Sequence, residues 1–352
     1  MVEAENYSSR IFKMKLLLIL LIAGASARKL QEKFSWKELE FAWPSEAVKQ
    51  EAIKSGKYVE SHNLPLGLDV WKDKLFITVP RWKSGVASSL NYIKISDEKS
   101  PVFHPYPSWE DNALPGDVKA ADKNAAYGGG RTDAKAAEKE DNVLEKNNKT
   151  IISTFRIRID ECDRLWVMDS GLADILGSPK QWAPNSVAIF DLNTDKLIRR
   201  FVIPEDQVKG DSFFANIEFS VSNTVLKNET LATSGDAYYA YTLLGDRGPK
   251  SQSTAEFYDK NTNTIFYTQI NRDAIGCWNI KKDFKPENQG LVDSDSDTLV
   301  FPNDLKIDSE GTLYVLSDRM PVFIYSSLKP EYNYRILTGK TSEIISGTPC
   351  QG

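Results

Sequence analysis

A short pattern that occurs four times along the chain limits the fold more than any other feature of this sequence. Each copy has two apolar residues around a variable one, then an aspartate, a polar turn of four or five residues, and three apolar or aromatic residues. The aspartates are Asp69, Asp160, Asp259 and Asp308. The pattern predicts a strand, a tight turn capped by the aspartate, and a second strand.

A second hairpin pattern follows three of the copies. Alternating apolar residues flank polar turns within residues 89–107, 186–204 and 323–337. Two hairpins give four antiparallel strands, and the copies at Asp259 and Asp308 lie 49 residues apart. A four-stranded unit that repeats near this length is typical of a β-propeller blade, so the sequence predicts an all-β propeller.

The predicted number of blades is about five. Four units are clear, and a degenerate or hybrid fifth falls between Asp211 and Lys250. A two-sheet sandwich would also have short strands at regular intervals, but it does not require the same hairpin four times. One short helix is expected within residues 43–56, with Ser45 as its N-cap and Gly56 at its end.

The N-terminus predicts a secretion signal at residues 1–27. Two lysines precede the apolar run at 16–23, and small residues follow it. Eight apolar residues are too few to cross a bilayer, which needs about 20. We therefore expect a secreted, extracellular protein with no membrane span and a single propeller domain at residues 28–352.

Residues 117–150 form a low-complexity insertion in this domain. They are rich in alanine and charged residues and contain one aromatic residue, which is too little apolar surface to offset the entropy of ordering. Asn148 and Asn228 begin glycosylation sequons, which fit an extracellular surface. The net charge of −5 over 352 residues favours neither nucleic acid nor an anionic membrane as a partner.

Metal and cofactor chemistry has little support in the sequence. The cysteines Cys162, Cys277 and Cys350 are too widely spaced for a zinc knuckle or a redox pair. With two histidines, His62 and His104, a histidine metal site or a Ser-His-Asp constellation is poorly supported. We expect no metal and no cofactor, and no catalytic residue can be named.

A ligand site is expected at the mouth of the propeller, where loops enter the inner strands. Polar residues at such positions are the candidate contacts. They are Asn303, Asp304, Asp318, Arg319, Asp169, Ser170 and Asn216. For any one of them the alternative is a capped turn or a hydrogen bond between blades. An acidic mouth with aromatic residues nearby would suit an aromatic amine or a catechol.

Several segments resemble the insect yellow and major royal jelly protein family, from about Trp36 to Cys350. They include "TVPRWKSGVASSLNYI", "RIDECDRLWVMDSG", "LGDRGPKSQSTAEF", "NRDAIGCWN" and "LYVLSDRMPVFIYS". The resemblance implies a six-bladed propeller. In the family, a motif like "FFANI" opens one blade and a motif like "EFSVSNTVLKNETLAT" closes the next, but here Ile217 runs directly into Glu218. More than one blade's worth of chain is therefore missing, which predicts a strained product.

The resemblance also carries expectations about pairing and function. It implies that Cys277 and Cys350 pair and that Cys162 has lost its partner. It favours a secreted protein that binds a small biogenic amine or catechol and acts in pigmentation or cuticle. The alternatives are a dopachrome-converting tautomerase, in which a buried Asp304 or Asp318 with a raised pKa moves the proton, and a storage or structural secretory protein.

Overall fold

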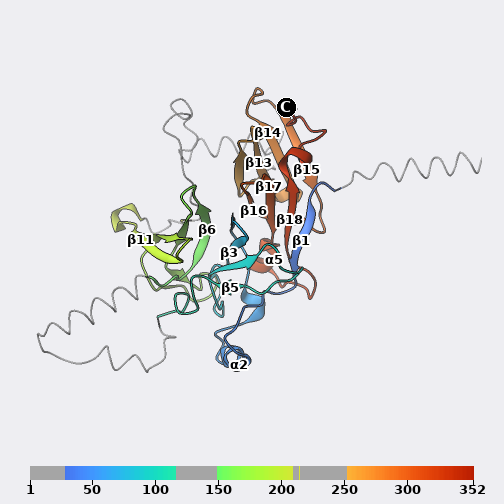
Figure 1. Ribbon diagram of the computed structural model, residues 1–352. Coiled ribbons are helices and arrows are strands. Elements are labelled where there is room, and N and C mark those ends of the chain that lie inside the picture. Colours follow the sequence, from blue (N-terminus) through green and yellow to red (C-terminus); the bar gives the residue numbers. More distant parts are fainter. Residues whose placement is uncertain (1–27, 116–148, 209–213, 215–251) are drawn as a thin grey trace, which may run out of the picture.

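The computed structural model describes residues 28–115, 149–208, 214 and 252–352, and its strands form four antiparallel sheets of four strands each (Figure 1). This confirms the all-β class, and each of the four aspartate units forms a hairpin at the start of one sheet. The predicted hybrid unit, the insertion and the signal peptide lie almost entirely outside the described residues, so a count of five blades is not tested.

The strands of each blade run in order from the inner to the outer strand. One blade has β2 (Leu68–Trp71), β3 (Lys74–Thr78), β4 (Leu90–Lys94) and β5 (His104–Pro105). The next has β6 (Thr154–Ile159), β7 (Arg164–Asp169), β10 (Ser186–Asp191) and β11 (Lys196–Val202), with a small ribbon of β8 (Leu172–Ala173) and β9 (Lys180–Gln181) inserted between them. A third has β12 (Glu256–Asp259), β13 (Thr264–Gln269), β14 (Ala274–Asn279) and β15 (Gln289–Ser294).

The fourth blade is built from both ends of the described chain. It contains β16 (Pro302–Ile307), β17 (Thr312–Ser317) and β18 (Tyr334–Lys340), and its outer strand is β1 (Gln31–Trp36). The hairpin expected within 323–337 is therefore wrong. The chain instead forms the short helix α5 (Met320–Tyr325), and β18 pairs with a strand about 300 residues earlier, which local sequence pattern cannot reveal.

The helical segments are short. Besides α5, the described residues form α2 (Glu46–Lys54), α6 (Thr341–Ile344) and the 3₁₀ turns Glu60–His62, Glu205–Gln207, Ile270–Arg272 and Pro286–Asn288. Helix α2 confirms the expected helix, because the Ser45 side chain accepts a hydrogen bond from the backbone N–H of Val48 at 3.3 Å. Gly56 follows the helix with a φ of +72°, a conformation that favours glycine.

The aspartates of the four hairpins play two different roles. Asp160, Asp259 and Asp308 accept hydrogen bonds from backbone N–H groups of their own turns, as expected. Asp69 does not, because β2 continues past it to Trp71 and the turn lies beyond its reach. Its carboxylate instead accepts a hydrogen bond, at 2.8 Å, from the backbone N–H of the last residue of β6 in the next blade.

The four inner strands surround a common axis. Strand β6 contacts β2, β2 contacts β16, and β16 contacts β12. Strands β12 and β6 contact each other through side chains, since the Arg158 guanidinium lies 4.4 Å from the centre of the Phe257 ring and, just beyond the two strands, Lys260 Nζ lies 3.9 Å from a carboxylate oxygen of Glu161. In Figure 1 the blade with β6 and β11 and the blade with β16 and β18 stand on either side of β3.

The hydrophobic core is divided among the interfaces between blades. One cluster joins the β2 and β16 blades, a second joins the β16 and β12 blades, and a third joins the β2 and β6 blades. Phe76 from β3 and Phe190 from β10, for example, are both fully buried in the third cluster. Each blade therefore buries its faces only against its neighbours, as in other repeat architectures.

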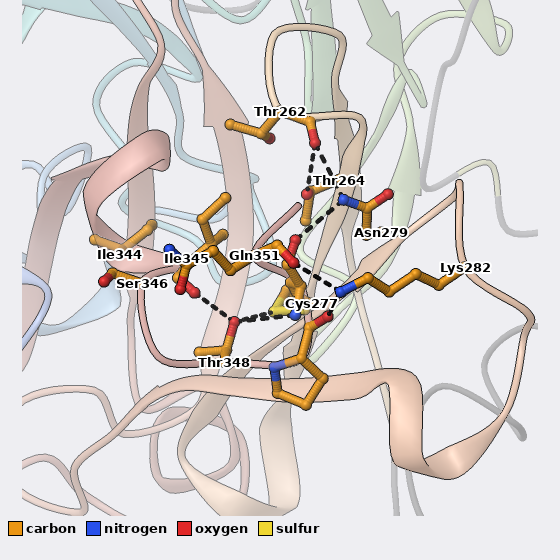
Figure 2. Close-up of a disulfide and its surroundings, with 12 residues drawn as sticks. Thr262, Thr264, Cys277, Asn279, Lys282, Ile344, Ile345, Ser346, Thr348 and Gln351 are labelled. Atoms are coloured by element: carbon orange, nitrogen blue, oxygen red, sulfur yellow. Dashed lines mark hydrogen bonds between the residues drawn. A yellow bond between two sulfur atoms is a disulfide. The ribbon is translucent and has the colours of Figure 1, made fainter.

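A disulfide fastens the C-terminal tail to the neighbouring blade (Figure 2). It joins Cys277 on β14 to Cys350, the pair that the family resemblance implies, with a Cα–Cα distance of 6.1 Å. Lys282 Nζ donates to the carbonyl oxygens of Pro349 and Gln351, each at 2.7 Å, which adds two polar contacts to the same link. Cys162 is an exposed free thiol.

Replacing Cys277 with serine should lower the free energy of unfolding by about 2–4 kcal/mol, because the bond closes a long loop, with a sequence separation of 73 residues. Urea denaturation under non-reducing conditions measures the change. Cys162→Ser is the matched control, and it should change stability by less than about 0.5 kcal/mol because the thiol is exposed. Equal midpoints for both variants would contradict a structural role for the bond.

Candidate functional site

Five buried polar residues meet where the inner strands converge. They are Arg156 on β6, Asn303, Asp304 and Lys306 on β16, and Asp318 directly after β17, and we call them the axial cluster. Asp304 and Asp318 are both 0% exposed. The structure brings three of the seven candidate residues, Asn303, Asp304 and Asp318, into one group.

Arg156 connects this group across the axis. One of its guanidinium nitrogens lies 2.9 Å from Asp304 Oδ2 and donates to the carbonyl oxygen of Leu66 at 3.0 Å. The other donates to Asn303, to its backbone oxygen at 2.7 Å and to its side-chain oxygen at 2.8 Å. A single side chain from β6 thus binds both β16 and the segment that leads into β2, so it links three blades.

Both carboxylate oxygens of Asp304 accept hydrogen bonds. One oxygen accepts from Lys306 Nζ at 3.0 Å, and the other accepts from the backbone N–H of Leu68 at 2.9 Å. Burial alone would raise the pKa of Asp304, but the charges of Arg156 and Lys306 and the Leu68 N–H outweigh it and hold the pKa below its usual range. Asp304 is therefore an ionised bridge between blades, which does not fit the hypothesis that its pKa is raised for proton transfer.

Asp318 has the opposite behaviour. Burial raises its pKa to about 7, and the negative charge of Asp304 acts in the same direction. Hydrogen bonds from Asn303 Nδ2 at 2.5 Å and from the backbone N–H of Met320 at 3.1 Å, together with the charge of Arg156, only partly oppose this. Asp318 is thus a carboxyl group that can take up or release a proton near neutral pH.

Met320 and Tyr334 lie next to the Asp318 end of the axial cluster. Trp82, Phe155 and Tyr334 belong to one hydrophobic cluster, against which Met320 packs. Met320 Sδ lies 3.7 Å from Asn303 Nδ2, and burial together with the charge of Asp318 raises the pKa of Tyr334. The indole N–H of Trp82, in the same hydrophobic cluster, is buried and has no hydrogen-bond partner in the described part of the chain.

Asp169 and Ser170 lie elsewhere, at the end of β7. Asp169 accepts from the backbone N–H groups of Ile152 and Ser153, at 3.1 and 2.9 Å, and pairs with Arg200 on β11 at 3.1 Å. The Ser170 hydroxyl donates to the carbonyl oxygen of Ser153 at 3.2 Å. These are contacts within one blade that fasten the start of β6, and they match the capped-turn alternative.

The remaining candidates are distributed differently. Arg319 adopts a φ of +51° and pairs with the Glu331 carboxylate at the surface. Asn216 and the sequon residues Asn148 and Asn228 lie outside the described residues.

Sequence reasoning missed Arg156 and Lys306. The signal for Arg156 was present, because the inner strand reads "TFRIRI" and places charged residues at alternate positions of an otherwise apolar strand. Such a residue on an inner strand must find a buried partner. The partner, on β16, lies nearly 150 residues away and could not be identified from the pattern.

A sequence model described as "Major royal jelly protein" matches residues 152–218 and 217–350, more than half of the chain. The chain belongs to this family. The two matched segments meet at residues 217 and 218, the position where the sequence predicts a missing segment.

Relatives named "Protein yellow" extend the match to nearly the whole chain. The protein of Drosophila erecta is 28% identical over 427 residues, covering 95% of this chain and 73% of the relative. The protein of Drosophila subobscura is 29% identical over 433 residues, covering 95% and 70%. Since 95% of this chain is about 334 residues, about 90 positions of the first alignment have no counterpart here, which agrees with the loss of internal sequence.

A solved structure of virginiamycin B lyase from Staphylococcus aureus is also similar, with 12% identity and a TM-score of 0.20. The match covers 73% of this chain and 49% of the lyase chain. A TM-score this low contributes nothing to the fold assignment. In the part of the chain that the structure describes, no helix has the length and apolar character needed to cross a bilayer.

Asp318→Asn should change how stability depends on pH. The folded-state pKa of about 7 lies above the usual aspartate value of 3.8, so the contribution of Asp318 is fully present below about pH 4 and is lost as the pH rises to 7. The variant lacks this loss, and its stability relative to the native chain should increase from pH 4 to 7 by up to about 4 kcal/mol and then stay level. Urea midpoints measured at intervals of half a pH unit give the profile.

Glu331→Gln is the control with the opposite sign. Pairing with Arg319 lowers the pKa of Glu331, so the carboxylate stabilises the native chain once the pH exceeds the usual glutamate pKa. Relative to the native chain, Glu331→Gln should therefore lose a little stability as the pH rises to that value and then stay level. Parallel profiles for Asp318→Asn and the native chain would contradict a raised pKa at Asp318.

Proposed function

We propose that this chain is a secreted member of the yellow and major royal jelly family that binds a small aromatic amine or catechol at the Asp318 end of the axial cluster and acts in insect pigmentation or cuticle. The observation that carries the proposal is the combination at this one place of a buried carboxyl group with a pKa near 7 and the neighbouring apolar and aromatic side chains of Met320 and Tyr334. Specificity for one ring-shaped ligand requires a few polar groups in such an apolar setting.

The chemistry of Asp318 suits an ammonium or a phenolic hydroxyl. A cation or a hydroxyl donor beside this carboxyl group would stabilise its ionised form, which burial otherwise disfavours. The Tyr334 ring beside Asp318 would contact the ring of the ligand. Asp318 is 0% exposed, so binding requires apolar neighbours such as Met320 to move aside.

Other features support the biological setting of the proposal. The apolar run near the N-terminus and the two sequons favour secretion. The similarity to proteins named "Protein yellow" favours a role in pigmentation.

A second candidate is tautomerase activity on dopachrome, and the raised pKa of Asp318 favours it. Tautomerisation moves a proton from one atom of the substrate to another and needs no oxidant. A carboxyl group with a pKa near the working pH can accept the proton as a base and return it as an acid.

Two measurements on the full chain test the proposal. Calorimetric titration with dopamine and serotonin should give saturable heat at pH 7.5, and Asp318→Asn should weaken binding at least tenfold because the ligand loses its charged partner. Asp169→Asn, at the other predicted location, should bind as well as the native chain. No heat with either amine, or equal affinities for both variants, would contradict ligand binding at Asp318.

The second measurement follows the absorbance of dopachrome. Conversion faster than the uncatalysed rate that falls in Asp318→Asn supports the tautomerase, whereas binding without conversion supports a carrier. Conversion that is unchanged in Asp318→Asn would exclude Asp318 as the proton carrier.

A further inference from the structure

A separate pocket of about 330 Å³ lies on the outer side of the β2 blade. Its lining comes from β3, β4, β5 and the segment after β5, together with Asp195 from the β10–β11 turn of the neighbouring blade. It shares no residue with the axial cluster, so it is independent of the function proposed above.

Aromatic rings form much of the wall. Tyr92 and His104 stack with their centres 5.1 Å apart, and Trp109 stacks on Trp43 at 4.7 Å. These ring pairs fix one another in position, so the wall is pre-formed. A pre-formed aromatic wall suits a flat apolar face on a ligand.

The Tyr106 hydroxyl is the most unusual group of the pocket. Tyr106 is 1% exposed, yet among the residues that the structure describes no acceptor meets hydrogen-bond geometry with its hydroxyl. Burial raises the pKa of Tyr106, and the nearby Asp195 carboxylate raises it further by its charge and by its position as a potential acceptor. This buried hydroxyl can gain a hydrogen-bond partner from a bound molecule once the side chains that cover it shift.

The charges of the pocket limit the kind of ligand. Lys74 Nζ lies 4.0 Å from Asp195 and 4.9 Å from the centre of the Tyr92 ring, so a cation already lies over that ring and leaves Trp109 and His104 as the aromatic surface for a ligand. Glu110 adds a second carboxylate to the lining. An added cation would meet Lys74, and an added anion would meet Asp195 and Glu110. A neutral molecule that carries both hydrogen-bond donors and acceptors is favoured over either ion.

We propose that this pocket binds one unit of a neutral sugar. A sugar ring has an apolar C–H face for the aromatic wall, and its hydroxyl groups can donate to Asp195 and Glu110 and accept from Lys74 and the Tyr106 hydroxyl. The pocket volume is at the low end of the range for small-molecule sites, which fits a single ring. A ligand of this size binds with a dissociation constant of about 1–10 mM.

A series of sugars that differ in charge tests the choice of ligand. Glucose and N-acetylglucosamine are neutral, glucosamine is cationic at pH 7, and glucuronate is anionic. Saturation-transfer NMR with the full chain should detect at least one neutral sugar, with affinity at least fivefold higher than that of either charged sugar. No signal from any sugar at 50 mM, or tightest binding by glucosamine or glucuronate, would overturn the proposal.

Tyr106→Phe locates the binding. The variant removes only a hydroxyl without a full hydrogen bond, so its urea midpoint should stay at the native value while its affinity for the neutral sugar falls about fivefold to tenfold. Tyr267→Phe changes a buried tyrosine in the β12 blade and should leave affinity unchanged. Equal sugar affinities for the two variants would overturn the assignment of the pocket.

Discussion

The buried contact between Arg156 and Asp304 is the interaction on which the arrangement of the blades depends. A charged pair in the interior gains little net stability, because its desolvation offsets most of its attraction. Its value is positional, since neither charge can remain buried without the other. Arg156 comes from β6, Asp304 from β16, and the Leu68 N–H of β2 completes the shell, so the blades must converge on this point. Asp69 of β2 also joins two blades, because its carboxylate accepts a hydrogen bond from the backbone N–H at the end of β6.

The apolar interior follows from this convergence. Each hydrophobic cluster lies between two blades, so no blade has a core of its own, and the blades are stable only as a set. Two long-range links hold the ends of that set. Strand β1 completes the sheet of β16 to β18, and the Cys277–Cys350 bond joins the tail after β18 to the β12 blade. Between β12 and β6 the described contacts include the Arg158 guanidinium over the Phe257 ring.

Local pattern predicted the parts of this protein that are built locally. The aspartate hairpins, the Ser45-capped helix and the grouping of Asn303 with Asp304 all follow from short-range rules of turn and strand chemistry. The same rules failed at Asp69, whose carboxylate serves the next blade, and after α5, where β18 pairs with the N-terminal strand. Arg156 escaped notice for the same reason, because its role depends on a partner far away in the sequence. The different pKa directions of Asp304 and Asp318 depend on such partners too.

A double-mutant cycle on Arg156 and Asp304 tests the central claim most directly. The variants are Arg156→Gln, Asp304→Asn and the pair together, with unfolding free energies from urea titration at pH 7. Removing either charge alone leaves the other buried without its partner, so each single variant should lose about 3–5 kcal/mol. The double variant should lose less than the sum of the two losses, by at least about 2 kcal/mol. Additive losses would show that the two charges do not hold the blades together.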